Sequence, residues 1–318
     1  MFHPSRSLRA FGRTRTLWQK KVNKVYDPAC GSGSLLLKFA KVLGKENVKN
    51  GFYGQEINPS TYNLCRINMF LHNINFDKFN IACEDTLTSP QHENDEPFEA
   101  IVSNPPYSVS WAGDNNPILI NDHRFTPAGV LAPKSKADMA FVMHSLSYLS
   151  TDGGAAIVCF PGIMYRGGAE KEIRKYLIDN NYVDSIIALP SDLFFGTSIA
   201  TCIMVIRKNK NENKTLFVDA SEEFTRGSAK NKLTSSNIAK IYDCVMNRSQ
   251  IDHFSSYVEN DFIAKNDYNL SVSTYVAQKD TREIIDIAML NAEIIKIVER
   301  QSTLRKQIDS IISNLNIA

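Results

Sequence analysis

The chain has 318 residues, of which 43% are apolar and 22% are charged. This composition is ordinary for a globular protein, and the length permits one large domain or two small ones. No apolar run approaches the roughly 20 residues that a membrane-spanning helix needs, so a transmembrane protein is excluded. The formal net charge of +2 neither requires nor excludes a nucleic-acid partner, because a basic face can lie within a balanced total.

The cysteines are scattered and include no Cys-x-x-Cys pair. A chain of this length does not need disulfides to hold its fold together. We therefore expect reduced thiols in a cytoplasmic protein, mostly within the core, and no metal site. The six cysteines are Cys30, Cys65, Cys83, Cys159, Cys202 and Cys244.

From Val22 onward, strand-like and helix-like segments alternate. The expected strands are "NKVYDPA", "GFYGQEI", "FNIACEDT", "FEAIVSNPP", "GGAAIVCFP", "VDSIIALP" and "IATCIMVIRK". The expected helices are "GSLLLKFAKVLG", "STYNLCRINMFLHN" with a Ser/Thr cap, "ADMAFVMHSLSYL" and "GAEKEIRKYLIDN". This order predicts an α/β fold, with a mostly parallel sheet, helices on both faces and ligands at the carboxyl ends of the strands.

After about Ser221 the pattern weakens into polar turns and short helices, and from Thr281 apolar residues follow alternating three- and four-residue steps. This heptad pattern favours coiled-coil packing against a partner, while a helix packed on its own domain is an equal alternative. Gln301 is the only polar residue in the pattern. The apolar positions are Ile287, Leu290, Ile294, Ile297, Leu304, Ile308, Ile311 and Leu315.

These patterns divide the chain into four parts. We expect an atypical N-terminal segment at 1–21, a main α/β domain at 22–220, a helical and loop extension at 221–279, and a C-terminal heptad helix at 280–318.

The segment "DPACGSGSLL" places Gly31 and Gly33 between an expected strand and an expected helix. Here the backbone can pass close to a ligand, and the helix N-terminus offers unpaired N–H groups. The third glycine of the dinucleotide-binding fingerprint is replaced by Leu36, which argues against a pyrophosphate ligand.

Acidic residues follow three successive expected strands. Asp27 would repel phosphate but suits a ligand that carries an ammonium or sulfonium group. Glu56 is placed to accept hydrogen bonds from two ribose hydroxyls, and Asp85 could accept one from an adenine amino group. Any one of them could instead be a helix cap or a solvated loop residue, but three beside the glycine-rich turn favour a binding site.

The segment "NPPY" follows the strand "FEAIVS". An amine on a heteroaromatic ring or a carbonyl is a poor nucleophile, and two acceptors on its N–H bonds would improve its attack on a methyl donor. The Asn104 side-chain oxygen and the Pro105 carbonyl can supply these acceptors, and Tyr107 can stack on a planar substrate. Alone, the motif could also be an ordinary turn.

Together, the glycine-rich turn and "NPPY" resemble the class I S-adenosylmethionine-dependent methyltransferases that methylate amino groups. The resemblance implies a target-amine site at Asn104, Pro105, Pro106 and Tyr107. It implies a cofactor site at Asp27, Pro28, Ala29, Gly31, Gly33, Glu56, Asp85 and Asn104. These motifs alone do not distinguish adenine in DNA from a glutamine side-chain amide.

Longer segments make the resemblance more specific. Over roughly residues 22–318 the chain resembles the modification subunit of type I restriction-modification systems, the HsdM family. The matching segments are "DPACGSGSLLL", "GQEINPSTYNLCRINMFLHN", "EDTL", "NDHRF", "PKSKADMAFVMHSL", "FPGIMYRGGAEKEIRKYLI" and "NDYNLSVSTYV".

This resemblance implies a cytoplasmic protein of a bacterium or archaeon that methylates the exocyclic amine of adenine. It implies DNA, a specificity subunit, a second copy of the modification subunit and a restriction subunit as partners, and the C-terminal heptads suit packing against the specificity subunit. Arg124, Lys134 and Lys136 are expected in a loop that faces DNA, although single basic residues are usually only solvated.

The N-terminal segment departs from the family, in which a long helical domain ends in a Thr-Pro segment that covers the cofactor. Here the chain begins "MFHPSRSLRAFGRTRTLWQKK", with four arginines and no acidic residue before Asp27. This composition superficially resembles a transit peptide or a basic arm. If the codons for Phe2 to Thr14 are shifted by one nucleotide, the genetic code permits "FTPQEVSELLAE", which predicts a frameshift and a truncated chain with impaired activity.

The sequence therefore predicts an adenine-specific DNA methyltransferase subunit. Two alternatives from other classes are a non-catalytic scaffold that binds the specificity subunit, and a protein-glutamine methyltransferase. The DNA recognition sequence is not encoded in these motifs.

Overall fold

The computed structural model describes residues 21–113, 116–194, 198–228, 230–279 and 287–315. The arginine-rich stretch and the possible frameshift lie outside these residues. The chain divides into two compact units, Met1–Gln278 and Lys279–Ala318, which we describe separately.

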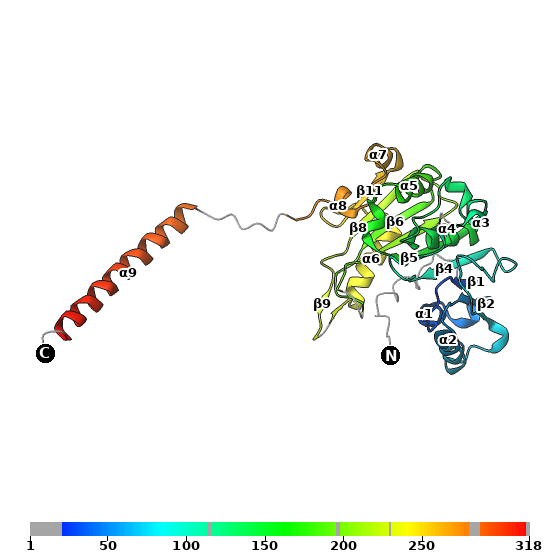
Figure 1. Cartoon of the computed structure of the whole chain (residues 1–318), viewed down its shortest axis with the longest axis horizontal. Helices are drawn as coiled ribbons and strands as arrows, with labels where there is room; N and C mark the ends of the chain where they lie inside the picture. Colours follow the sequence, from blue (N-terminus) through cyan, green and yellow to red (C-terminus); the bar gives the residue numbers. More distant parts are fainter. Residues whose placement is uncertain (1–20, 114–115, 195–197, 229, 280–286, 316–318) are drawn as a thin grey trace. The chain divides into compact units, whose positions relative to one another are not determined.

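The first unit contains a nine-stranded sheet in the order β11-β8-β6-β7-β5-β4-β1-β2-β3 (Figure 1). Most neighbouring strands are parallel, but β7 runs antiparallel to β5 and β6, and β11 runs antiparallel to β8. The strands are β1 Val22–Asp27, β2 Val48–Gln55, β3 Phe79–Ala82, β4 Phe98–Ser103, β5 Leu149–Cys159, β6 Val183–Ala188, β7 Cys202–Arg207, β8 Lys214–Asp219 and β11 Ser255–Glu259. A separate pair is formed by β9 Thr225–Arg226 and β10 Asn231–Lys232.

Helices cover both faces of this sheet. They are α1 Ser34–Leu43, α2 Pro59–Leu71, α3 Pro117–Ile120, α4 Asp138–Tyr148, α5 Ala169–Asp179, α6 Ser235–Asn247, α7 Asn260–Lys265 and α8 Val272–Tyr275. One core contains residues of α4, α5, α7 and α8, and the other contains residues of α1, α2 and α6. Successive strand residues alternate between the cores, as Val25 and Tyr26 do, because strand side chains point to opposite faces. The predicted α/β fold is confirmed.

Four local features differ from the sequence-based expectation. The strand β8, which lies between β11 and β6 in the main sheet, was not expected. The region after Ser221 contributes β11 to the main sheet, although polar turns and short helices were expected there. The cap of α2 is Asn58, whose side chain accepts hydrogen bonds from the backbone of Ser60 and Thr61. An asparagine oxygen caps a helix as well as a hydroxyl does, so N-cap preferences alone did not distinguish Asn58 from the expected Ser/Thr cap. In addition, β3 ends at Ala82 and leaves a short loop before Asp85.

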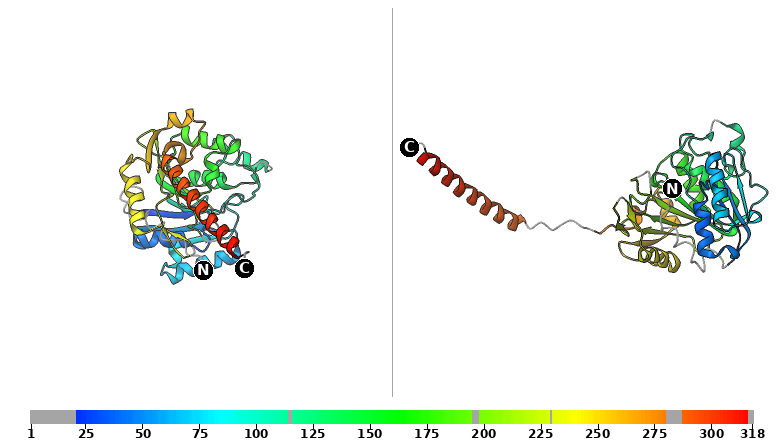
Figure 2. Two further views of the ribbon diagram at one scale, coloured as in Figure 1. Left: turned by 90° about the vertical axis from the view of Figure 1, so that its left-hand side faces the viewer. Right: turned by 90° about the horizontal axis from the view of Figure 1, so that it is seen from below.

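The second unit contains one long helix, α9, at Ile287–Leu315 (Figure 2). All eight expected apolar heptad residues lie on this helix and are exposed, with between 47% and 71% of their surface accessible. The residues 280–286 lie outside the described part of the chain.

Within the described residues, no helix is both long enough and apolar enough to cross a bilayer. All six cysteines are free, and five of them are buried.

Gly33 provides a stability test of the turn before α1. Its φ is +77°, and an added Cβ would lie 2.7 Å from the buried Sγ of Cys65. Gly129 has a similar φ of +70° but open space around it. We expect Gly33→Ala to destabilise the fold by at least about 1 kcal/mol more than Gly129→Ala, because both carry backbone strain but only the first creates a clash. Chemical denaturation measures the difference, and equal losses would contradict the packing described.

Candidate functional site

The site begins at the turn between β1 and α1. Gly31 and Gly33 both have positive φ, at 54° and 77°. The turn is held against β2, because the Cys30 amide donates to the Gln55 carbonyl at 3.0 Å. No side chain caps α1, so the N–H groups of its first turn can donate to a ligand.

Glu56 directly follows β2 and contacts this turn. One of its carboxylate oxygens accepts from the Gly31 amide at 3.0 Å, and the other accepts from the Asn58 amide at 2.8 Å. Each oxygen retains a second lone pair, so the carboxylate can also accept from ligand hydroxyls. The structure thus brings the predicted Glu56 and Gly31 together.

Asp27, the last residue of β1, is buried, with 1% of its surface exposed. Its Oδ1 accepts from the Ala29 amide at 3.0 Å. Burial raises the pKa of Asp27 from the ordinary 3.8 to about 7, and the nearby charge of Glu56 raises it too, while the Ala29 hydrogen bond opposes the shift. A cation close to Asp27 would favour its ionised form.

Asp85 lies in the loop after β3. Its Oδ1 accepts from the Leu87 amide at 2.9 Å, so part of its hydrogen-bonding capacity shapes its own loop. The next residue, Thr86, donates through its hydroxyl to the Pro28 carbonyl at 2.6 Å. This bond ties the Asp85 loop to the segment that follows Asp27.

The Asn-Pro-Pro-Tyr segment follows β4, which pairs in parallel with β1. The Asn104 and Pro106 positions are exposed and Pro105 is buried. The Tyr107 hydroxyl donates to Asn104 Oδ1 at 2.6 Å. Burial raises the pKa of Tyr107, so this hydroxyl stays protonated and orients the amide.

Two residues that shape the site were not expected from the sequence. Gln55 is fully buried, and its amide bonds to the backbone of Glu84, Ser89 and Gln91, which fixes the Asp85 loop. Asp138, the first residue of α4, accepts from the Ser108 amide at 3.0 Å, just after Tyr107. Two sequence signals could have indicated these residues. Gln55 is a polar residue at the end of an apolar strand, and Asp138 is an acidic residue at the start of a helix.

Arg124, Lys134 and Lys136 are the residues expected in a loop that faces DNA. Lys134 is exposed and Lys136 is half-buried. Arg124 differs, because only 1% of its surface is exposed and its guanidinium donates to the Thr86 and Leu87 carbonyls. The expectation that the Arg124 side chain is solvated is therefore wrong, because its guanidinium is buried.

These residues fit S-adenosylmethionine. Gly31 has open space where a Cβ would be, so a ligand can approach its backbone closely. The surrounding acids suit a ligand with cationic and hydroxyl groups and disfavour a pyrophosphate. Among the described residues, no group of His, Cys, Asp and Glu could hold a metal ion.

Comparison with known families decides the class of protein. Residues 11–284 match the family of N-6 DNA methylases. The chain belongs to this family. Its glycine-rich turn and Asn-Pro-Pro-Tyr segment both lie within the matched region.

Curated relatives of the chain are methylase subunits of type I restriction enzymes. The chain is 51% identical to the type I restriction enzyme MpnII methylase subunit of Mycoplasma pneumoniae, over 93% of this chain and 56% of that subunit. It is 33% identical to the MjaVII methylase subunit of Methanocaldococcus jannaschii, over 92% of this chain and 52% of that subunit. The chain thus spans about half the length of the curated relatives it matches.

A solved structure agrees with this assignment. The methyltransferase subunit of a type I restriction-modification system from Streptococcus thermophilus superposes with a TM-score of 0.80 at 36% identity. The superposition covers 86% of this chain and 59% of that subunit.

The raised pKa of Asp27 predicts a pH-dependent stability. Between pH 4 and pH 7 the folded chain holds a proton on Asp27 that the unfolded chain releases, so the parent loses stability as pH rises through this window. Asp27→Asn does not titrate there. We expect its thermal stability to match the parent near pH 4 and to exceed it by about 1–4 kcal/mol at pH 8.

Thermal unfolding monitored by circular dichroism at the two pH values measures this difference. Asp77→Asn, which changes an exposed carboxylate, is the control and should show no comparable gain. A pH-independent difference between parent and Asp27→Asn would contradict the assignment.

Proposed function

We propose that this chain is the methyltransferase part of a type I modification subunit and methylates the exocyclic amine of adenine in DNA. The observation that carries the proposal is the placement of two chemically different groups at adjacent strand ends. Asp27 ends β1, and Asn104 follows β4, its parallel neighbour. The strand order reverses between these strands, and open α/β sheets bind ligands at such a point.

The cofactor side of the site would hold S-adenosylmethionine through Asp27, Gly31, Gly33, Glu56 and Asp85. When bound, this cofactor supplies a methyl group activated by a sulfonium. Glu56 has two oxygens with free lone pairs for ribose hydroxyls, and its bond to Gly31 fixes their position. Asp27 is buried, so its negative charge would attract the cationic group of the cofactor with less screening than an exposed carboxylate would.

The target side would hold the adenine amine through Asn104 and Pro105. Tyr107 donates to one lone pair of Asn104 Oδ1, which leaves the second to accept from the amine. Two acceptors on the N–H bonds keep the nitrogen lone pair directed toward the methyl donor. A base within a duplex must leave the stack to reach these groups, and the Tyr107 ring provides a surface for stacking.

Adenine is favoured over a glutamine amide by the family. The relatives with 51% and 33% identity are methylase subunits of restriction enzymes, and the matched family is that of N-6 DNA methylases. Asn104 can accept a hydrogen bond from the planar amine of either substrate. The two substrates are therefore distinguished by identifying which molecule receives the methyl group.

Asn104→Ala tests the target site. With the cognate specificity subunit and duplex DNA, we expect methyl transfer from labelled S-adenosylmethionine to fall at least about 100-fold, because a positioned acceptor is lost at the reacting nitrogen. The fold should be retained, since Asn104 is exposed. Asn63→Ala, on the exposed face of α2, is the matched control.

The label should reside on N6 of adenine. Transfer to a glutamine-containing peptide without DNA would instead support the protein methyltransferase alternative. Full activity of Asn104→Ala would contradict the assigned role.

We also propose that α9 joins this chain to the specificity subunit, in a bacterial or archaeal cytoplasmic complex with DNA, a second modification subunit and a restriction subunit. The exposed apolar stripe of α9 supports this partner, because a repeat of alternating three- and four-residue steps suits knobs-into-holes packing. Its apolar residues would be buried in such a coil.

A matched pair of substitutions tests this interface. Leu304→Asp places a charge in the stripe, whereas Ser302→Asp places the same charge on the opposite side of α9. We expect Leu304→Asp to weaken association with the specificity subunit at least about 30-fold by calorimetry, because a carboxylate would be buried without a partner. Ser302→Asp should change it less than threefold, and equal effects would argue against the stripe.

A further inference from the structure

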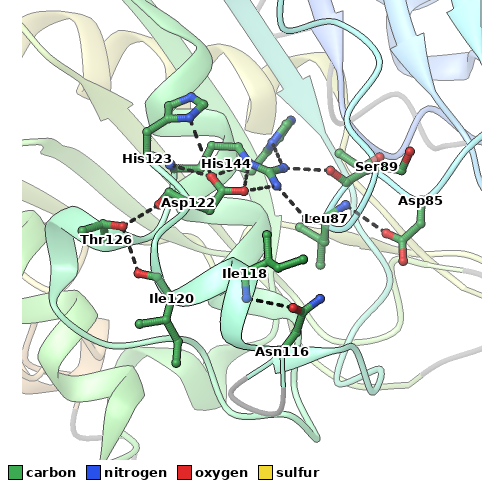
Figure 3. A network of polar contacts seen from close by, with 12 residues as sticks. Asp85, Leu87, Ser89, Asn116, Ile118, Ile120, Asp122, His123, Thr126 and His144 are labelled. Carbon is green, nitrogen blue, oxygen red and sulfur yellow. Dashed lines mark hydrogen bonds and ion pairs between the residues drawn. The ribbon is translucent and has the colours of Figure 1, made fainter.

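Arg124 is buried, with 1% of its surface exposed, and belongs to a polar network. Figure 3 shows other members of this network, among them Asp122, Leu87 and His144. Its Nε and Nη2 donate to the Asp122 carboxylate, with a shortest distance of 2.6 Å. Burial alone would raise the pKa of Asp122, but the hydrogen bonds and charge of Arg124 outweigh it and hold that pKa below its usual range. The two residues therefore form a partly buried ion pair that fixes the guanidinium.

The remaining donors of Arg124 reach the loop that carries Asp85. Nη1 donates to the Thr86 carbonyl at 2.9 Å, and Nη2 donates to the Leu87 carbonyl at 2.8 Å. Since Nη1 also contacts His144, all five N–H groups of the guanidinium have partners. A buried arginine needs such complete pairing, so the loop backbone is held in one position.

His144 extends the network to β1. Its Nδ1 lies 3.1 Å from Arg124 Nη1, and its Nε2 lies 3.0 Å from the Tyr26 hydroxyl. Arginine can only donate, so Nδ1 is the acceptor and Nε2 carries the hydrogen toward Tyr26. Burial, with the nearby charge of Arg124, lowers the pKa of His144 and keeps the ring neutral. Tyr26 directly precedes Asp27.

The network thus contacts the segments that carry two of the three acidic residues of the proposed cofactor site, Asp27 and Asp85. It supports the Asp85 loop through two carbonyls, and it fixes the residue before Asp27 through His144. His144 lies on α4, whose first residue, Asp138, holds the backbone just after Tyr107. One helix therefore anchors the cofactor-side loop and the target-side loop.

We propose that Arg124 is a positioning residue for the cofactor, which acts by holding the 84–89 loop in the shape that binds S-adenosylmethionine. The inference rests on the proposed function only for the identity of the ligand. It replaces the sequence-based expectation for Arg124, which placed the residue on the DNA side. Under this proposal, Arg124 contacts neither the cofactor nor DNA.

Arg124→Lys is the first test, because it keeps the charge and the pairing with Asp122 but loses the forked donors. We expect the Kd of S-adenosylmethionine, measured by calorimetry on the full chain, to rise at least tenfold. With the specificity subunit and DNA at saturating cofactor, kcat should stay within threefold of the parent. This separation would distinguish positioning of the cofactor loop from general loss of structure.

Arg174→Lys is the matched control. Arg174 is equally buried and donates to two backbone carbonyls, those of Tyr268 and Ile163. It is not part of the proposed cofactor site. We expect Arg174→Lys to lower thermal stability as Arg124→Lys does, while the Kd changes less than twofold.

Hydrogen exchange of the ligand-free protein provides a readout that does not depend on the cofactor. The amides of Leu87 and Ser89 both donate to Asp85. Their exchange should accelerate at least tenfold in Arg124→Lys and stay unchanged in Arg174→Lys. If the parent binds no S-adenosylmethionine, the proposed function fails, yet this exchange still tests the positioning of the loop.

If Arg124→Lys does not fold, Asp122→Asn removes the charge and one of the two acceptor oxygens that orient the guanidinium. It should raise both the Kd and the exchange rate by two- to fivefold. The proposal is overturned if a folded Arg124→Lys, or in its place Asp122→Asn, leaves loop exchange within the experimental error of the parent.

Discussion

Parallel pairing of β1 with β2 on one side and β4 on the other is the constraint on which the site depends. It brings three carboxyl-terminal strand ends to one edge of the sheet, and the chain places Asp27, Glu56 and Asn104 at those ends. Residues that are far apart in sequence therefore become neighbours without any long-range sequence signal. The glycine-rich turn also contacts Glu56, because the Gly31 amide donates a hydrogen bond to the Glu56 carboxylate.

Burial of polar groups gives this edge its shape. Asp27 is held out of water. Gln55 bonds to the loop after β3 through both ends of its side-chain amide, and Arg124 donates to two carbonyls of that loop. Such groups stabilise a fold only when fully paired, so they specify one loop conformation where apolar packing would permit several. Under the proposed function, this rigidity helps the site to align two reactants before reaction.

Much of this could be predicted from the sequence. The alternation of strands and helices, the acids at strand ends and the turn at Gly31 and Gly33 follow from local periodicity and backbone chemistry. The strand β11 was missed because the segment "SSYVE" lacks apolar alternation and obtains its stability from pairing with β8. Arg124 was misplaced because a charged residue between turns is usually exposed, and its burial depends on carbonyls and a histidine from other parts of the chain.

The most direct test of the account is calorimetric titration of the full chain with S-adenosylmethionine and, separately, with NADH. The acids at the strand ends and Leu36 in place of a third glycine predict that S-adenosylmethionine binds at one site per chain and that the dinucleotide does not. Binding of NADH at this site, or no binding of S-adenosylmethionine even with the specificity subunit and DNA present, would contradict it.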